Sequence, residues 1–106
     1  MGGAKGASEN GLMSVREIAA HLLGNCGSLK QFDAYMFGSI LRGVGHDIDL
    51  LIVGPGGQVL SRLKQELQAA GESLPLHILY MQPSEERYTH FVKRQNCVTL
   101  AELMRS

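Results

Sequence analysis

One stretch decides the fold of this chain: Phe37-Gly-Ser-Ile-Leu-Arg-Gly-Val-Gly-His-Asp-Ile-Asp-Leu-Leu-Ile-Val53. The apolar run at residues 34–37 is typical of a short buried strand, which Gly38 ends. Residues 47–53 predict another strand, because apolar and β-branched side chains dominate its second half. Residues 39–45 between them predict a turn or a short helical fragment.

Helical patterns flank these two strands. Ser14 and Glu17 have the spacing of a capping box, and the apolar residues behind them recur as one helix face that ends at Gly24. A second helix is predicted over residues 58–70. The faces expected to be buried consist of Val15, Ile18, Ala19, Leu22 and Leu23 in the first helix and Leu60, Leu63, Leu67 and Ala70 in the second.

The remainder of the chain predicts a third strand and two more helices. The strand covers residues 76–81 and is closed by Pro83, and Ser84 is expected to cap the next helix. A capping box at residues 99–102 predicts a short terminal helix. The alternation of helices and strands predicts an α/β fold, with a small mixed sheet flanked by helices. Near the C-terminus, the side chains expected to face the core are Tyr88, Phe91 and Val92.

Composition limits the size and class of the protein. With 106 residues, 44% hydrophobic and 19% charged, the chain has the composition of one globular domain. Residues 1–12, rich in glycine and small side chains, are expected to form a flexible arm, and residues 13–106 to form the domain.

Charge and cysteine content narrow the partners and the compartment. Ten basic residues balance ten acidic ones, which argues against autonomous binding of nucleic acid. Cys26 and Cys97 lie far apart, so neither a disulfide framework nor a zinc site is predicted. No apolar run approaches the roughly 20 residues that a membrane span needs. We therefore expect a cytoplasmic protein that does not bind membranes.

Asp47 and Asp49 are the candidate metal ligands and catalytic residues. Two positions apart on a strand, both carboxylates leave the same face, about 6.5–7 Å apart along the backbone. Their repulsion is roughly 2.5 kcal/mol at an effective dielectric constant of about 20, and a divalent cation would offset it. Hard oxygen ligands suit Mg²⁺, which takes one or two carboxylates together with water and phosphate. Gly38 and Ser39, between a strand and a helix start, could supply phosphate contacts.

This stretch resembles the minimal nucleotidyltransferases of the DNA polymerase β-like superfamily, whose motif is Gly-Ser, a short loop, and Asp-x-Asp entering an apolar strand. The likeness is close over residues 34–53 and, by the order of elements, extends over most of the chain from Ser14. It implies that Gly38 and Ser39 bind the phosphates of a nucleoside triphosphate such as ATP, and Arg42 is a further nucleotide-binding candidate.

The resemblance also implies a reaction and a cofactor. The Asp47–Asp49 pair would hold Mg²⁺, or Mn²⁺, while a nucleoside monophosphate is transferred to an acceptor hydroxyl. Minimal members lack a substrate domain and often work with a separate helical protein. A partner of that kind, in a toxin–antitoxin-like pair, is therefore one expectation for the acceptor.

Two features depart from the family pattern. Seven residues separate Ser39 from Asp47, a shorter loop than is usual. His77 stands where the family has a third carboxylate, which binds metal and helps to activate the attacking hydroxyl. Histidine can bind Mn²⁺ or Zn²⁺ but is a poor Mg²⁺ ligand. His77 is thus a candidate metal ligand, and the alternative function is a catalytically degenerate module that binds nucleotide or protein.

Simpler interpretations of the same residues stay open at the sequence level. Asp47 and Asp49 could be solvated residues at a strand entrance, Ser39 a plain N-cap, and Arg42 a surface residue. His77 could be an ordinary strand histidine. In that case the chain would be an unrelated α/β interaction domain, in which the acids and the Gly-Ser pair do not meet.

Overall fold

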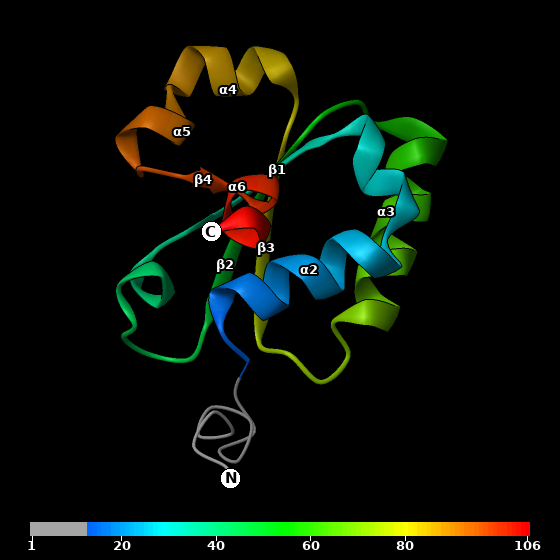
Figure 1. Ribbon diagram of the computed structural model, residues 1–106. Helices are drawn as coiled ribbons and strands as arrows, with labels where there is room; N and C mark the ends of the chain where they lie inside the picture. Colours follow the sequence, from blue (N-terminus) through cyan, green and yellow to red (C-terminus); the bar gives the residue numbers. More distant parts are fainter. Residues whose placement is uncertain (1–12) are drawn as a thin grey trace, which may run out of the picture.

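The computed structural model describes residues 13–106 (Figure 1), so the predicted arm at residues 1–12 lies outside the described part of the chain. The elements in chain order are α2 (Val15–Asn25), the 3-10 helix η2 (Gly27–Gln31), β1 (Asp33–Phe37), the 3-10 helix η3 (Ser39–Arg42), β2 (Ile48–Val53), α3 (Gly57–Ala70), β3 (Leu76–Met81), α4 (Pro83–Thr89), α5 (Phe91–Arg94), β4 (Val98–Thr99) and α6 (Leu100–Arg105).

The four strands form one mixed sheet in the order β3-β2-β1-β4. β1 runs antiparallel to both of its neighbours, β2 and β4. β2 and β3 are parallel, and α3 makes the crossover between them, as a parallel connection requires. The predicted α/β fold with a small mixed sheet and flanking helices is therefore confirmed.

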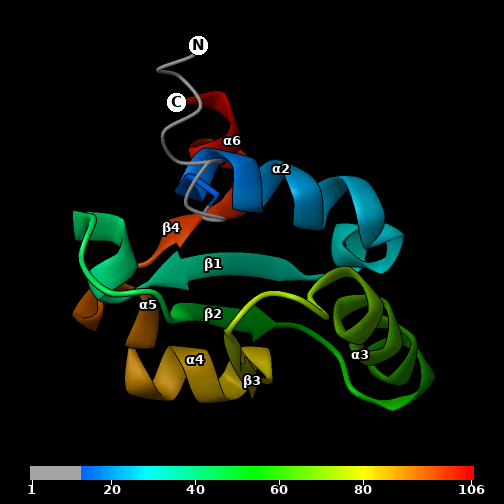
Figure 2. The ribbon, with the colours of Figure 1, turned by 90° about the horizontal axis from the view of Figure 1, so that it is seen from below.

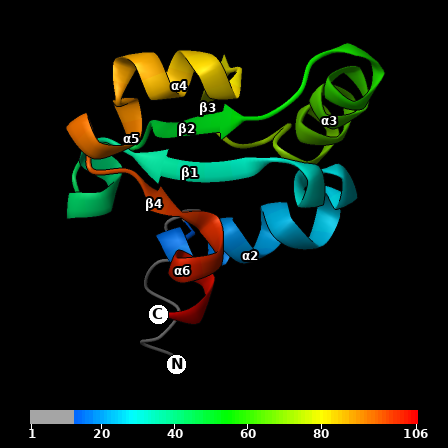
Figure 3. The same cartoon turned by 90° about the horizontal axis from the view of Figure 1, so that it is seen from above.

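The hydrophobic core lies on one face of the sheet. Figures 2 and 3 show α2 and α6 on one side of the strands and α4 and α5 on the other. Alternate strand residues, Met36, Leu50 and Ile52 among them, join buried side chains of α2, α3 and α6 in one cluster. Both capping boxes form: the Ser14 hydroxyl accepts from the Glu17 amide at 3.1 Å, and Thr99 pairs with Glu102 in the same way.

The opposite face carries the other half of β2. Asp49, Leu51 and Val53 alternate with the core residues, so they point toward the side of α4 and α5. α5 is held against the sheet by Phe91, whose ring packs edge-on against Phe37 with centroids 5.1 Å apart.

Two predictions for the region after β3 were wrong. Tyr88 does not face the core and is 88% exposed, because His90 adopts a left-handed conformation (φ 54°) that separates α4 from α5; Phe91 and Val92, which follow it, are both partly buried. The N-cap of α4 is Gln82 rather than Ser84. Pro83 explains the shift, since a proline fits the first helical position and needs no hydrogen bond there.

Candidate active site

The two aspartates stand at the entrance to the central strand β2. Asp47 precedes the first strand residue and is exposed, while Asp49 lies inside the strand and is half-buried. In the sheet register Asp49 lies between Phe37 of β1 and His77 of β3. This end of the sheet therefore presents two carboxylates next to the turn that follows β1.

Gly38 is in direct contact with Asp49. A Cβ built on Gly38 would lie 2.5 Å from Oδ2 of Asp49, closer than side chains approach each other. Gly38 also has φ 90° and ψ −169°, a conformation that residues with a Cβ rarely adopt. Glycine is thus required at position 38 for two reasons, the backbone conformation and the close approach of Asp49. Because glycine has no side chain, the Asp49 carboxylate can lie against the Gly-Ser turn.

The short loop folds back on Ser39. The carbonyl of Ser39 accepts a hydrogen bond from the Val44 amide at 3.2 Å. The hydroxyl of Ser39 lies 3.4 Å from the position that a Cβ on Gly45 would take. Ser39 is not an N-cap: Gly38 occupies that position, without any side-chain cap. The helix that follows is a single 3-10 turn of four residues, so it offers less of an amide cluster than the sequence predicts.

His77 interacts with Asp47. Its Nε2 lies 3.5 Å from Oδ1 of Asp47, with the two side chains 62% and 72% exposed, and no other histidine, lysine or arginine within residues 13–106 has a side-chain nitrogen within 4.0 Å of a carboxylate oxygen. Nowhere in this part of the chain do three or more His, Cys, Asp or Glu side chains form a group that could hold a metal ion. The predicted ligand set of Asp47, Asp49 and His77 is accordingly not assembled as one three-ligand cluster.

Arg42 lines a cavity that sequence reasoning did not assign. The cavity has a volume of about 350 Å³ and lies between the Gly-Ser turn and the end of α5. Arg94 faces it too, and its guanidinium donates to the carbonyl of Thr89 at 3.3 Å. Among the described residues no carboxylate lines this cavity, so it combines two arginines with neutral groups. Its lining residues are Gly38, Leu41, Arg42, Arg94, Gln95 and Asn96.

The acids that follow β3 have structural roles. Glu85 completes the capping box of α4, and Glu86 accepts from the amide of Val92 at 3.2 Å. Neither approaches Asp47 or Asp49 as a third carboxylate. His46 is exposed in the loop before β2.

The two cysteines are packed thiols rather than nucleophiles. Cys26 is buried, and burial, together with the nearby Glu66 carboxylate, raises its pKa. Burial and the Glu86 carboxylate raise the pKa of Cys97 to about 11. A thiol with a raised pKa is a poor nucleophile at neutral pH, since the thiolate is the reactive form.

We expect Cys97 to react slowly with iodoacetamide at pH 8. A pKa of about 11 rather than the ordinary 9.0 leaves about a hundredfold less thiolate at that pH. The rate in folded protein should keep rising with pH above 9, whereas in concentrated urea it should level off near 9. Mass spectrometry of the modified peptides measures both; equal rates in folded and unfolded protein at pH 8 would contradict the prediction.

Comparison with known proteins identifies the family. A family model described as a nucleotidyltransferase domain matches residues 13–97. No curated protein and no solved structure gives a significant match. No helix within residues 13–106 is long and apolar enough to cross a membrane. The interpretation as an unrelated α/β interaction domain is excluded by this match together with the fold. This chain belongs to the nucleotidyltransferase domain family.

Proposed function

We propose that residues 13–106 form one domain that binds a nucleoside triphosphate with Mg²⁺ and transfers its nucleoside monophosphate to an acceptor hydroxyl. The observation that carries this proposal is the contact between Gly38 and Asp49. It places a metal-binding type of side chain against the turn that would hold phosphate. In a chain of the nucleotidyltransferase domain family, this is where a nucleotide–metal complex is expected.

Charge supports the placement of the triphosphate. Asp49 lies against Gly38, and Gly38 also lines the cavity that contains Arg42 and Arg94. Phosphate oxygens near the carboxylates could be joined to them by a bound cation. Phosphate oxygens at the other end of the triphosphate could accept hydrogen bonds from the two guanidinium groups. Arg94 thus joins Gly38, Ser39 and Arg42 as a proposed phosphate contact.

The residues present fit a hard divalent cation. Mg²⁺ is usually held by one or two protein carboxylates and takes its remaining ligands from water and substrate phosphates. Asp47 and Asp49 supply two such carboxylates at the entrance to β2. When bound, the cation would polarise phosphate oxygens and neutralise charge on the leaving pyrophosphate. Mn²⁺ is the alternative that the imidazole of His77 would favour.

In the proposed reaction the acceptor oxygen forms a bond to the α-phosphorus while the bond from that phosphorus to the bridging oxygen of pyrophosphate breaks. The hydroxyl proton passes to a base. We assign this role to Nε2 of His77 in its neutral form, which lies next to Asp47 and takes the proton when Mg²⁺ is bound and the imidazole is not itself a metal ligand. The Asp47 carboxylate at 3.5 Å would stabilise the imidazolium that results.

A second candidate function is favoured by His77 itself. It occupies the strand position next to Asp49 where the family has a third carboxylate, and it pairs with Asp47 instead. Such a site could bind a nucleotide without turning it over. The protein would then be a degenerate nucleotide- or protein-binding module, and a helical protein partner of the toxin–antitoxin kind is the associated proposal.

Thermal shifts and pyrophosphate release together test both functions. Each nucleoside triphosphate is added with Mg²⁺, Mn²⁺ or EDTA to wild type and His77→Asp. Ligand at 100 times its dissociation constant stabilises by roughly 2.7 kcal/mol, which raises the midpoint on the order of 10 °C in a domain of this size. We expect a metal-dependent shift in wild type, together with pyrophosphate release in which water takes the place of the acceptor hydroxyl and the nucleoside monophosphate is the second product.

The other outcomes separate the candidates. A metal-dependent shift without pyrophosphate, with release appearing only in His77→Asp, would establish the degenerate module. No shift with any nucleotide and metal would contradict nucleotide binding by the isolated chain in both candidates.

A further inference from the structure

β3 is an edge strand with free hydrogen-bonding groups. Among the strands of residues 13–106 it pairs only with β2, in parallel, through bonds that include Ile48 N–H to the Pro75 carbonyl (3.0 Å) and Gly54 N–H to the Met81 carbonyl (3.1 Å). In a parallel ladder alternate residues turn toward the neighbour. The peptide groups of Ile78 and Tyr80 therefore point away from the sheet.

The strand lacks the features that usually protect an edge. Natural edges are shortened, bulged, or carry charged residues or proline. The strand Leu-His-Ile-Leu-Tyr-Met of residues 76–81 has six residues, with no proline, lysine or acid and an unbroken register with β2. The other edge, β4, is only two residues long. Leu79 on β3 is one of the few large apolar side chains that are exposed, at 39%.

We propose that two copies of this chain associate through antiparallel pairing of their β3 strands, about a two-fold axis at Ile78. The outward peptide groups allow this register: the Ile78–Ile78 pair can form both of its hydrogen bonds, and the Tyr80 N–H can donate to the Leu76 carbonyl of the second copy, while the Leu76 N–H already donates to the Leu74 carbonyl at 2.8 Å. Ile78 then lies opposite Ile78 of the second copy, and Leu76 lies opposite Tyr80. The two four-stranded sheets become one continuous sheet.

An open cavity beside β3 gives the side chains of a second copy a place to pack. It has a volume of about 730 Å³ and lies between α3 and β3. Leu76, Ile78 and Tyr80 line it from the strand, and Leu67 and Leu74 lie along its inner wall. The proposed register sets the same three strand residues of the second copy alongside them, so each copy closes the cavity of the other. On the opposite face, it covers the exposed Leu79.

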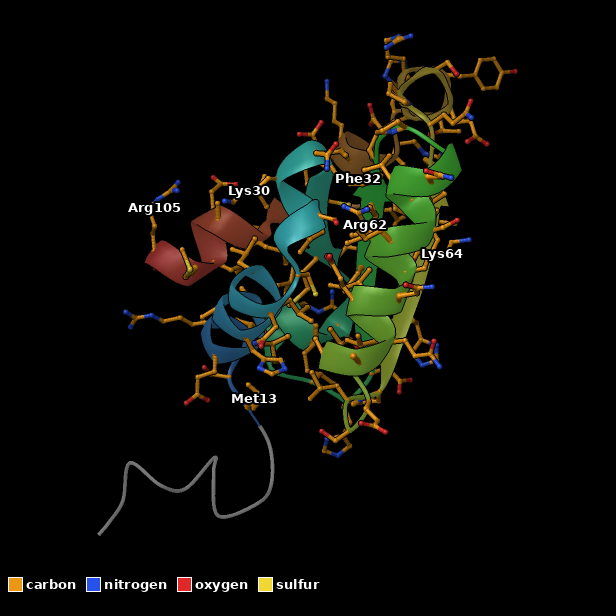
Figure 4. All side chains as sticks on the ribbon, turned by 90° about the vertical axis from the view of Figure 1, so that its right-hand side faces the viewer. Met13, Lys30, Phe32, Arg62, Lys64 and Arg105 are labelled. Atoms are coloured by element: carbon orange, nitrogen blue, oxygen red, sulfur yellow. The ribbon has the colours of Figure 1, made fainter. Side chains whose placement is uncertain are left out.

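The charges on α3 are complementary under the same two-fold axis. Lys64 lies over the ring of Tyr80, 4.9 Å from its centroid, and Figure 4 shows Lys64 on the side of α3 next to β3. Glu72 lies at the other end of the cavity, just after Gly71, which packs against Leu76. In the proposed dimer Tyr80 lies opposite Leu76 of the second copy. Lys64 of one copy therefore faces the end of the second copy's cavity that carries Glu72, and the two-fold axis produces this Lys64–Glu72 pair twice.

Charge reversal tests the arrangement. Sedimentation equilibrium or light scattering on the full chain should show a concentration-dependent dimer. Lys64→Glu and Glu72→Lys should each weaken the dimer by about tenfold, since the two-fold axis changes two pairs at once. The double variant Lys64→Glu/Glu72→Lys should restore dimer formation. A wild type that stays monomeric at millimolar concentration, or a double variant no better than the singles, would overturn the proposal.

A backbone substitution gives a second test that does not depend on charge. Ile78→Pro removes an N–H that points away from β2, so the internal sheet keeps its bonds. We expect this variant to fold, by circular dichroism, and to be monomeric. A folded Ile78→Pro variant that still dimerises with wild-type affinity would rule out pairing through β3.

Discussion

Replacing Asp49 by Asn is expected to abolish nucleotidyl transfer, with a fall in kcat/KM of at least about a thousandfold. The substitution keeps the size of the side chain and its place against Gly38 but removes the charge that would hold the cation. Metal coordination supplies several kcal/mol of transition-state stabilisation, and each 1.36 kcal/mol corresponds to a factor of ten. Pyrophosphate release with saturating triphosphate and Mg²⁺ measures the effect.

The same variant should be at least as stable as wild type without ligand. The Asp49→Asn substitution removes the repulsion from Asp47, which is partly screened because Asp47 is exposed and lies beside His77. The metal-dependent thermal shift should disappear as well. Asp33→Asn is the matched control, since Asp33 is an exposed aspartate at the opposite end of β1. Full activity in Asp49→Asn, or an equal loss in Asp33→Asn, would sink the assignment of Asp49 as a ligand.

Replacing Gly38 by Ala is expected to lower the free energy of unfolding by about 2 to 4 kcal/mol. An alanine at φ 90° and ψ −169° carries strain of order 1–3 kcal/mol, and its Cβ would collide with Oδ2 of Asp49. In a domain of this size the midpoint should fall by roughly 10 °C or more. Urea denaturation and differential scanning calorimetry measure both quantities.

Gly24→Ala is the matched control for that substitution. Gly24 lies within α2, and a Cβ there would meet nothing within 4 Å. Because glycine weakens a helix interior by about 0.5–1 kcal/mol, this variant should be slightly more stable than wild type. If Gly38→Ala were as stable as Gly24→Ala, the close contact with Asp49 would not exist in solution. Gly38→Ala should also lose the metal-dependent nucleotide shift, since Asp49 must move.

Much of the fold was predictable because local signals and burial agree. The capping box at Ser14 and the apolar spacing behind it predicted α2, and Leu63 and Leu67 are buried on the predicted face of α3. The strands β2 and β3 were predicted to within one residue of their observed bounds. In each case one stretch of sequence contains both the spacing of the apolar residues and the residues that begin or end the helix or strand.

The errors came from features that short-range patterns do not encode. The left-handed residue His90 interrupts what looks like one helix, and β4 is only two residues long and exists because it pairs with β1. Residues 27–31 form a 3-10 helix whose Ser28 is fixed by Glu66, 38 positions away. Such pairings are decided by tertiary contacts.

The candidate site divides in the same way. The motif residues Gly38, Ser39, Asp47 and Asp49 lie within twelve positions of one another, so their proximity was predictable. Arg94 lies 45 positions after Asp49 and belongs to no sequence motif of the site. Its place near Arg42 depends on the contact of Phe91 with Phe37 and on the pairing of β4 with β1, and no local pattern reports either.

The packing of the first described helix against the last has a consequence for how the chain folds. α2 and α6 are in extensive contact, and Arg16 donates to the carbonyl of Met104, 88 positions away. Contacts between such distant positions require large loops to close before they stabilise anything, which slows folding. The core cannot be completed by any early segment alone. Folding is therefore expected to be all-or-none and to take milliseconds rather than microseconds. The backbone amides of α2 and α6 should be protected from hydrogen exchange to the same degree.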